Sequence, residues 1–511
     1  MSEDKIVSKS IAQFIVDNPS LTGFETPKSG GYQLIREIVE NSTDSTEIIQ
    51  ILPDIELSIK KLNGYFKVKV KDNGIGLSDI DIPKAFGSVL TSSKYINKQQ
   101  RGIFGMGIKS VLLYAYITTN KPFIITSSKF SSFGKIHKIS IYEMVIDTVT
   151  NQPRVVSHEV KENKRRWHGF ELEFQIGYVD FDSVMKEIRE YLAITHAICP
   201  YANITFRYND QAYLYQRKVN KAPIAPMATK FHPYGVEFDY FKTIAIAEPT
   251  FGVVQFLTRN FQRVGHTIAD QFCKFAKIDP VRQMKTFSHD ELFNLKLKMN
   301  EFDGWQPPNA SGLSIIGEEY FMEGTKELHD VDFFTYKAGK GVFSGSAFVV
   351  EVCCVIPKDK PKSEGKNGDN VEIHRIVNKI PLIEDYKSCL LRKIFDDYNW
   401  NYYKIDTNSM KLVFYVHFCS SSRQKIFKDL RKGTVADTPE IRKVLDLTIK
   451  DALRKVSSFS MNKERRDSDQ KRVSRFEYYT KVMSKSLSYL SNKPKEEVEE
   501  KLRKCLIHEN V

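Results

Sequence analysis

Cysteine is scarce in this chain, and no two cysteines have the spacing that a zinc site or a redox motif requires. The 511 residues include seven cysteines, an odd number, and none lies in a Cys-x-x-Cys pair. This pattern argues against a disulfide framework and against a zinc ribbon. We therefore expect neither disulfides nor structural zinc.

Long apolar runs are also missing. No stretch approaches the ~20 apolar residues that a bilayer-spanning helix needs, and the N-terminal MSEDKIVSKS lacks the apolar core of a signal peptide. Hydrophobic residues still make up 41% of the chain, enough for about three globular domains. We expect a cytoplasmic protein with no membrane partner.

Acidic residues are outnumbered by basic ones. Lysine and arginine total 76 against 63 aspartates and glutamates, which gives a net charge of +13. Such an excess favours an anionic partner such as nucleic acid. A merely solvated basic surface is the alternative interpretation.

The apolar periodicity predicts a mixed chain that ends in helices. It predicts helices over Tyr32–Ser42, Ile108–Thr118, Val253–Phe261, Thr267–Phe275 and Ser288–Asn300, strands over Leu57–Val70 with a turn at Asn63–Gly64, and further strands at FIITSS, KIHKISIYEMVI, FELEFQI, FVVEVCCVI and KLVFYVHFC. Proline-rich breaks separate these regions at Pro223–Pro233 and Trp305–Gly312. From Pro439 onward the chain reads as a charged helix.

A carboxylate and an amide share one face of the first helix. Glu37 and Asn41 lie four residues apart in REIVENSTDS, so both side chains point the same way. A carboxylate so placed can polarise a water molecule, and an amide oxygen can hold a Mg²⁺ ion on phosphates. A solvated helix face is the more frequent explanation of such a pair taken alone.

Two glycine-containing motifs follow in a fixed order. KDNGIG follows the expected strand YFKVKV. Asp72, at the strand end, can accept a hydrogen bond from an exocyclic amine, while Gly74 and Gly76 let a flat base approach the backbone. In RGIFGMGIKS, the glycines at 102, 105 and 107 expose backbone N–H groups that can cradle phosphates. The second motif is not a P-loop, because Ile108 stands where that motif needs glycine.

These three motifs resemble the nucleotide-binding boxes of the ATPase superfamily that unites gyrase, heat-shock chaperones, histidine kinases and MutL repair proteins. Longer segments narrow the resemblance to the B subunits of topoisomerase VI: LTGFETPKSGGYQLIREIVENSTDS, FQRVGHTIADQF, LSIIGEE and NKIPLIEDY. They occur in that family's order and extend over nearly the whole chain.

The resemblance implies an α+β fold in four parts. These are an N-terminal Bergerat-type ATPase α/β sandwich with its strap (residues 1–228), a small helix-two-turns-helix insert (229–306), an α/β transducer domain with a long C-terminal helix (307–470), and a helical tail that contacts an A subunit (471–511).

The resemblance also assigns roles to residues. It makes Glu37 the general base with Glu40 in support, Asn41 the Mg²⁺ ligand, Asp72 the adenine contact, and Lys432 in RKGTVAD the catalytic contact to the γ-phosphate. The implied ATP-binding set is Asn41, Asp72, Gly74, Gly76, Ser93, Lys94, Gly102, Ile103, Phe104, Gly105, Met106, Gly107, Ile108, Lys109 and Lys432.

The implied activity is that of an ATP- and Mg²⁺-dependent component of a type IIB DNA topoisomerase. ATP would dimerise two N-terminal domains around double-stranded DNA, with residues before about Phe24 exchanged between the copies. A separate cleaving A subunit would complete an A2B2 heterotetramer that relaxes supercoils and decatenates DNA.

Two departures from the family pattern stand out. Phe170 follows Gly169 where the family usually has threonine, and Asn401 replaces a lysine in Trp400-Asn401-Tyr402-Tyr403, an element implicated in DNA sensing. Two alternatives stay open. One is another ATPase of the superfamily, either MutL-like or chaperone-like, and the other is a non-hydrolysing structural partner of a DNA-cleaving protein.

Overall fold

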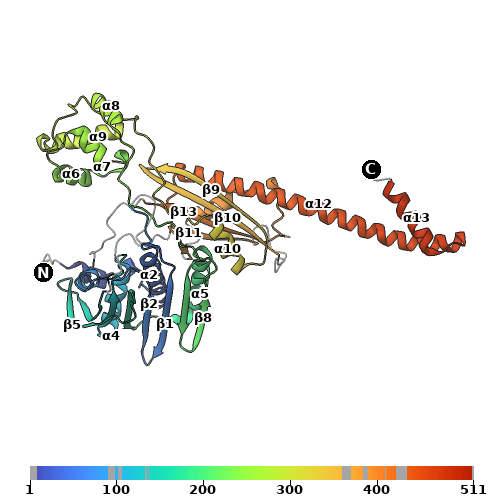
Figure 1. Ribbon diagram of the computed structural model, residues 1–511, viewed down its shortest axis with the longest axis horizontal. Coiled ribbons are helices and arrows are strands. Elements are labelled where there is room, and N and C mark those ends of the chain that lie inside the picture. Colours follow the sequence, from blue (N-terminus) through green and yellow to red (C-terminus); the bar gives the residue numbers. More distant parts are fainter. Residues whose placement is uncertain are drawn as a thin grey trace, which may run out of the picture.

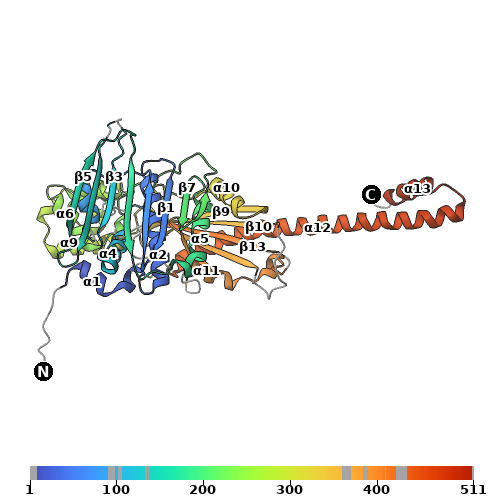
Figure 2. The same cartoon turned by 90° about the horizontal axis from the view of Figure 1, so that it is seen from below.

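The structure, a computed structural model, describes residues 9–89, 98–101, 106–132, 135, 137–358, 370–383, 389–408, 410–421 and 434–508. Three packed units follow one another along the chain, and a long helix projects from the third (Figures 1 and 2). No helix in the described part has the length and apolar character needed to cross a membrane.

The first unit is one eight-stranded sheet with helices on one face, in the order β5-β4-β3-β6-β2-β1-β7-β8. β1 pairs antiparallel with β2 and parallel with β7. Its elements are α1 (Ile11–Asp17), η1 (Pro19–Thr22), α2 (Pro27–Glu47), β1 (Asp54–Leu62), β2 (Tyr65–Asp72), α3 (Asp81–Phe86), α4 (Gly107–Thr119), β3 (Phe123–Ser128), β4 (Ile139–Asp147), β5 (Gln152–Lys161), β6 (Gly169–Ile176), α5 (Phe181–Ile198), β7 (Asn203–Tyr208) and β8 (Gln211–Tyr215).

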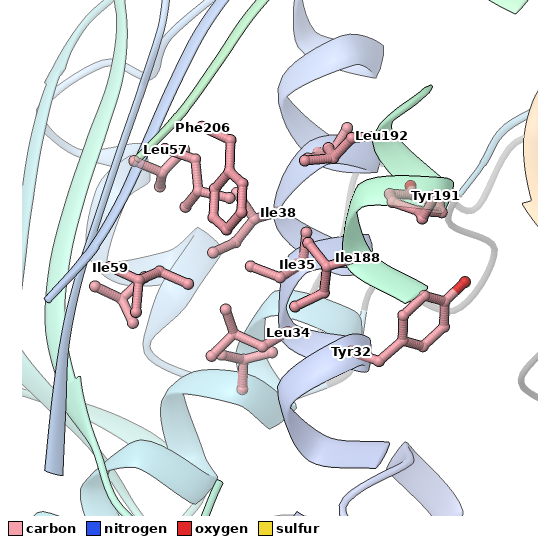
Figure 3. Packing of buried hydrophobic residues seen from close by; sticks show 14 of the residues in the cluster. Tyr32, Leu34, Ile35, Ile38, Leu57, Ile59, Ile188, Tyr191, Leu192 and Phe206 are labelled. Carbon is pink, nitrogen blue, oxygen red and sulfur yellow. The ribbon is translucent and has the colours of Figure 1, made fainter. Parts of the chain in front are cut away.

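Helix α2 begins sharply because its first turn is capped. Thr26 and Ser29 form a reciprocal capping box, and Pro27 occupies the first helical position. Leu34, Ile35 and Ile38 are buried at helical spacing. These side chains fill the space between the sheet, where Leu57 and Phe206 lie, and α5, which contributes Ile188 and Leu192 (Figure 3). This packing fixes the orientation of the polar face of α2.

The second unit is a small helical body with its own core. Its elements are η2 (Pro233–Gly235), α6 (Phe238–Ala247), α7 (Val253–Asn260), α8 (His266–Ala276), η3 (Met284–Thr286) and α9 (His289–Glu301). Phe241, Phe256, Phe261 and Phe272 are almost fully buried in it. A capping box between Ser288 and Glu291 starts α9.

The third unit is a five-stranded sheet in the order β12-β11-β13-β10-β9. Its elements are α10 (Glu318–Leu328), β9 (Val331–Phe343), β10 (Ser346–Pro357), β11 (Val371–Val377), β12 (Ile380–Leu382), α11 (Leu390–Lys393), η4 (Ile394–Asp397), η5 (Trp400–Tyr403) and β13 (Leu412–Ser420), followed by α12 (Pro439–Ser491) and α13 (Lys495–His508).

Strand β10 is buried on both faces, which explains why its sequence is apolar at nearly every position. Val350 and Val352 face the core shared with α12, whereas Cys353 and Val355 face the core of the first unit. Helix α10 packs against α5, so the first and third units share one continuous apolar contact. Glu351 is the polar exception, fully buried within this strand.

The expected α+β class is confirmed, and each predicted helix and strand has a counterpart. The helix expected at Tyr32–Ser42 is part of α2, and the run FVVEVCCVI forms most of β10. The charged segment KERRDSDQKRVSR lies on α12 and is exposed throughout. Sequence periodicity did not single out three strands that complete the first sheet, β5, β7 and β8. It also did not single out helix α5, which packs beside α2.

Candidate nucleotide site

The three sequence motifs meet at one end of the first sheet. A methyl group at Gly107, the first residue of α4, would lie 1.6 Å from Oε2 of Glu37 on α2. A methyl group at Gly74, just beyond β2, would lie 1.9 Å from Oγ of Ser45 on the same helix. An alanine at either place would therefore force a side chain of α2 to move, because the start of α4 lies directly against Glu37 and the end of β2 directly against Ser45.

The two carboxylates of α2 have different surroundings. Glu40 is buried and accepts a hydrogen bond from Nε of Arg36 at 2.7 Å. Glu37 is partly exposed, and its Oε1 accepts a hydrogen bond from Nε2 of Gln33 at 2.7 Å. Glu40 is thus engaged in an internal ion pair, while Glu37 lies beside the N-terminus of α4.

Asp72 is a buried carboxylate that ends β2. Its Oδ1 accepts the backbone N–H of Gly74 at 2.9 Å. Burial raises the pKa of Asp72 to about 6, and this rise is partly offset by hydrogen bonds from Gly74, Ser42, Phe170 and Ser45. A carboxylate held in this way can accept a hydrogen bond from a ligand amine once it is ionised.

The rim around Asp72 explains the departure at Phe170. The aromatic ring of Phe170 stacks on Phe86 with centroids 5.0 Å apart, and its backbone N–H reaches Asp72. Gly169 has φ +131°, and a methyl group there would lie 2.2 Å from the carbonyl oxygen of Asp72. The backbone contact to Asp72 therefore does not depend on the residue type at 170.

Asn41 has an orientation suited to a cation. Its Nδ2 donates to the carbonyl oxygen of Glu37 at 2.6 Å, and the side chain is partly exposed. Its Oδ1 is the kind of neutral oxygen ligand that Mg²⁺ accepts alongside phosphate oxygens. Asn41 and Glu37 lie on one face of α2, as their spacing predicts.

The start of α4 places the last members of the predicted ATP-binding set. Met106 and Ile108 are partly buried and pack against the hydrophobic core. Lys109 is buried, and burial lowers its pKa to about 8. Gly76 (φ +58°) lies so close to Ser128 that a methyl group would be 2.0 Å from the Ser128 carbonyl oxygen.

The other predicted site residues lie outside the described residues. They are Ser93, Lys94, Gly102, Ile103, Phe104, Gly105 and Lys432.

Several polar residues of this region were not singled out from the sequence. Gln33 contacts Glu37, while Ser42 and Ser45 contact Asp72. His168 places Nδ1 2.9 Å from the carbonyl oxygen of Gly74. The i,i+4 spacing of Gln33 and Glu37 on a predicted helix was the one available signal.

Known families match two parts of the chain. Residues 32–166 match the family described as histidine kinase-, DNA gyrase B- and HSP90-like ATPase. Residues 308–472 match the family described as topoisomerase VI B subunit, transducer.

Full-length relatives are similar over nearly the whole chain. The B subunit of type 2 DNA topoisomerase 6 from Saccharolobus shibatae is 32% identical over 493 residues, which cover 95% of this chain and 91% of the relative. The protein of the same description from Sulfurisphaera tokodaii is 32% identical over 500 residues, covering 96% and 91%.

Among solved structures, the 43K ATPase domain of Thermus thermophilus gyrase B in complex with an aminocoumarin is similar at 12% identity. Its TM-score is 0.42, and the alignment covers 91% of this chain and 96% of that chain.

Proposed function

Because the chain belongs to the family of type 2 DNA topoisomerase 6 B subunits, we propose that it hydrolyses ATP at the site formed by α2, the end of β2 and the start of α4. It carries an ATPase domain of the gyrase B and HSP90 type followed by a topoisomerase VI B transducer. It is the ATPase subunit of a type IIB DNA topoisomerase. The assignment of the catalytic base rests on the different surroundings of the two carboxylates: Glu40 is buried against Arg36, whereas Glu37 is partly exposed beside the start of α4.

Glu37 is the general base of this proposal. Its carboxylate takes a proton from the water that attacks the γ-phosphorus, and the products are ADP and inorganic phosphate. Glu40 cannot serve equally well, because its carboxylate is buried against Arg36 at 2.7 Å. Gln33 restricts the rotation of the Glu37 carboxylate through its 2.7 Å hydrogen bond, which makes Gln33 a positioning residue.

The phosphates are proposed to lie at the N-terminus of α4. A helix of 13 residues directs backbone N–H groups and a positive dipole end there. Asn41 would hold Mg²⁺ through Oδ1, and the ion would neutralise charge on the phosphate oxygens. The fit rests on Gly107, where a methyl group would fill the space beside Glu37. Ser93, Lys94, residues 102–109 and Lys432 complete the proposed phosphate contacts.

The adenine is proposed to bind at Asp72. Its carboxylate would accept the exocyclic amine, and Gly74 and Gly76 would let the ring approach the backbone. Four hydrogen-bond donors already orient the Asp72 side chain. A guanine carries a carbonyl oxygen at the corresponding position. This acceptor would face the Asp72 carboxylate, which is also an acceptor, and no hydrogen bond would form.

Dimerisation and DNA passage form the larger cycle that we propose. ATP would join two N-terminal domains around double-stranded DNA, with an exchange of residues before Phe24, and a cleaving A subunit would attach to the C-terminal tail in an A2B2 assembly. The tail is suited to a partner, because Tyr489 and Leu490 at the end of α12 are 89% and 78% exposed. The domain boundaries proposed for this cycle are 1–228, 229–306, 307–470 and 471–511.

The test compares the two carboxylates of α2. Magnesium-dependent ATP hydrolysis, nucleotide binding and thermal melting are measured on wild type, Glu37→Gln and Glu40→Gln. We expect Glu37→Gln to bind ATP and melt like wild type but to lose turnover by at least about a hundredfold. We expect Glu40→Gln to lose stability by about 3–5 kcal/mol, because it removes the carboxylate that forms an ion pair with the buried Arg36.

The opposite pattern would contradict the proposal. Turnover that survives Glu37→Gln assigns the base elsewhere. A wild-type chain that neither binds nor hydrolyses ATP would instead support the role of a non-hydrolysing structural partner.

A further inference from the structure

Two consecutive residues, Gln99 and Gln100, contact the third unit. The side-chain amide of Gln99 pairs with the backbone of Ser314 in both directions. Its Oε1 accepts the Ser314 N–H at 2.7 Å and its Nε2 donates to the Ser314 carbonyl oxygen at 3.0 Å. The carbonyl oxygen of Gln100 accepts Nδ2 of Asn378 at 3.4 Å. Arg101 follows and enters a buried charge cluster.

That cluster joins two cations and two carboxylates. Arg101 donates to Oε1 and Oε2 of Glu47 at 2.7 and 3.0 Å and to Asp44 at 2.9 Å. Lys379, from the third unit, places Nζ 3.8 Å from Oε2 of Glu47 and donates to Oγ of Ser314 at 2.7 Å. Arg101, Glu47 and Lys379 are each at most 4% exposed. The opposite charges balance in number, which is the condition for burying them together.

Charge on Glu47 is permanent at physiological pH. Burial by itself raises the pKa of Glu47, but attraction by Arg101 and Lys379 outweighs it and lowers the pKa to about 2. Tyr201 also donates its hydroxyl to this carboxylate. The cluster is therefore an ion-pair network at neutral pH.

Lys379 occupies a backbone conformation that lysine avoids. Asn378 and Lys379 form the two-residue turn between β11 and β12, with φ of 47° and 64°. Such turns favour Asn-Gly, because the second position also requires a positive φ. A lysine stands here although glycine would suit the turn better, and its Nζ lies 3.8 Å from Oε2 of Glu47. Residues in strained backbone often serve a function.

The turn is fastened to the centre of the second sheet. The backbone N–H of Lys379 donates to Nε2 of His417 at 3.1 Å, so the proton of this imidazole is on Nδ1, 2.6 Å from Oε2 of Glu351. Glu351 in turn accepts the N–H groups of Ile316 and Gly317. The Oδ1 atom of Asn378 accepts the N–H of Ser420, the last residue of β13.

We propose that Lys379 is a positioning residue for ATP hydrolysis, through which the transducer sheet sets the positions of Arg101 and of the C-terminal end of α2. This inference rests on the function proposed above. Arg101 directly precedes the predicted phosphate-binding residues, and Glu47 ends the helix that carries Glu37 and Asn41. A shift of the transducer sheet moves Lys379 and therefore alters both sides of the nucleotide site. We call the contact formed by Lys379, Glu47, Arg101 and Ser314 the Lys379 joint.

The experiment removes the charge of Lys379 in the full chain. Lys379→Met is compared with Lys277→Met, because Lys277 is also a lysine at positive φ (57°) but is exposed at the end of α8. ATP turnover without DNA is measured below the melting temperature of every variant. We expect Lys379→Met to lower kcat about tenfold with KM changed less than about threefold, as for residues coupled in one network. Lys277→Met should behave as wild type.

A double-mutant cycle separates positioning from folding. If Lys379 acts through Glu47, adding Lys379→Met to a Glu47→Gln variant should lower kcat by less than about a further twofold. Ser314→Ala, which removes only the Oγ partner of Lys379, should lower kcat in the same direction, and it decides the question if Lys379→Met does not fold. Lys379→Arg, which keeps the charge, should recover part of the turnover.

The inference is overturned if Lys379→Met, or Ser314→Ala in its place, turns over like wild type. It is also overturned if the double variant loses kcat by the product of the two single losses, because the two residues would then act independently. A wild-type chain without ATPase activity overturns the proposed function and this inference together. If wild type hydrolyses ATP and these substitutions leave kcat unchanged, only the role of the Lys379 joint is overturned and the proposed function stands.

Discussion

Gln33 lies one helical turn before Glu37 on α2 and donates Nε2 to Oε1 of that carboxylate at 2.7 Å. The other side of Gln33 is covered by Gly23, which has φ +87° and where a methyl group would lie 3.0 Å from Cγ of Gln33. Gly23 directly follows η1, in the N-terminal segment that is proposed to exchange between two copies. Gln33 thus connects that segment to the proposed base.

Gln33→Leu should lower kcat for ATP by about tenfold, because an unrestrained carboxylate spends less time aligned with the attacking water. KM should change little, since Gln33 has no proposed contact with the nucleotide. Steady-state kinetics on wild type and Gln33→Leu, with Glu37→Gln as the inactive reference, measures this. A raised KM at normal kcat would show that Gln33 serves binding instead.

ATP affinity should depend on pH through Asp72. Burial raises the pKa of Asp72 to about 6, so the carboxylate that accepts the adenine amine becomes protonated as the pH falls through 6. The dissociation constant for ATP should therefore rise below pH 6 and level off above pH 7. Isothermal titration between pH 5 and 8 measures it. Asp72→Asn is the control, and we expect it to weaken ATP binding by about 10- to 100-fold. The pH dependence of the dissociation constant that remains in this variant comes from the nucleotide itself.

The same carboxylate should reduce the stability of the chain at neutral pH. The folded pKa of about 6 lies above the unfolded value of about 3.9. Proton binding to Asp72 thus contributes stability that is fully present below the unfolded pKa and is lost as the pH rises through 6. Asp72→Asn should melt at or above the wild-type temperature at pH 8, and this advantage should shrink toward pH 4. Thermal melts across this range test the prediction, and a lower melting temperature for Asp72→Asn at pH 8 would contradict it.

Gly107→Ala should abolish turnover, because its methyl group would lie 1.6 Å from Oε2 of Glu37 and displace the carboxylate. We expect a loss of at least about a hundredfold in kcat, similar to removal of a general base. Gly265→Ala is the matched control. Gly265 also stands at the start of a helix, here α8, but has no atom within 4 Å of the added methyl group. Equal losses in both variants would mean that the effect is not specific to Glu37.

The sequence predicted helices, strands and the side chains they bring together wherever a single short segment determines the local structure. The four-residue spacing of Glu37 and Asn41 predicted a shared helix face. The mostly apolar run FVVEVCCVI predicted a strand, which is buried on both faces as β10. Asp72 was expected at a strand end, and it is the last residue of β2. These features depend on local periodicity and on turn residues alone.

Contacts between distant segments could not be predicted in this way. Gln99 and Ser314 are 215 positions apart, and no periodicity links them. The difference between Glu37 and Glu40 depends on which carboxylate is covered by the rest of the fold, because both lie on the same helix. The burial of Lys379 likewise follows from the packing of two units, since in the sequence it is an ordinary lysine in a turn.

Helix α12 has one further mechanical consequence. Its 53 residues span about 80 Å, but buried side chains anchor only the part from Ile441 to Ser460 on the second sheet. The remaining 31 residues to Ser491 extend about 46 Å beyond the last anchored turn. Treated as a rigid rod, this segment converts a tilt of about 10° at the transducer into a displacement of about 8 Å at its far end. A small rotation at its base thus becomes a movement larger than a helical turn, at a distance from the proposed nucleotide site.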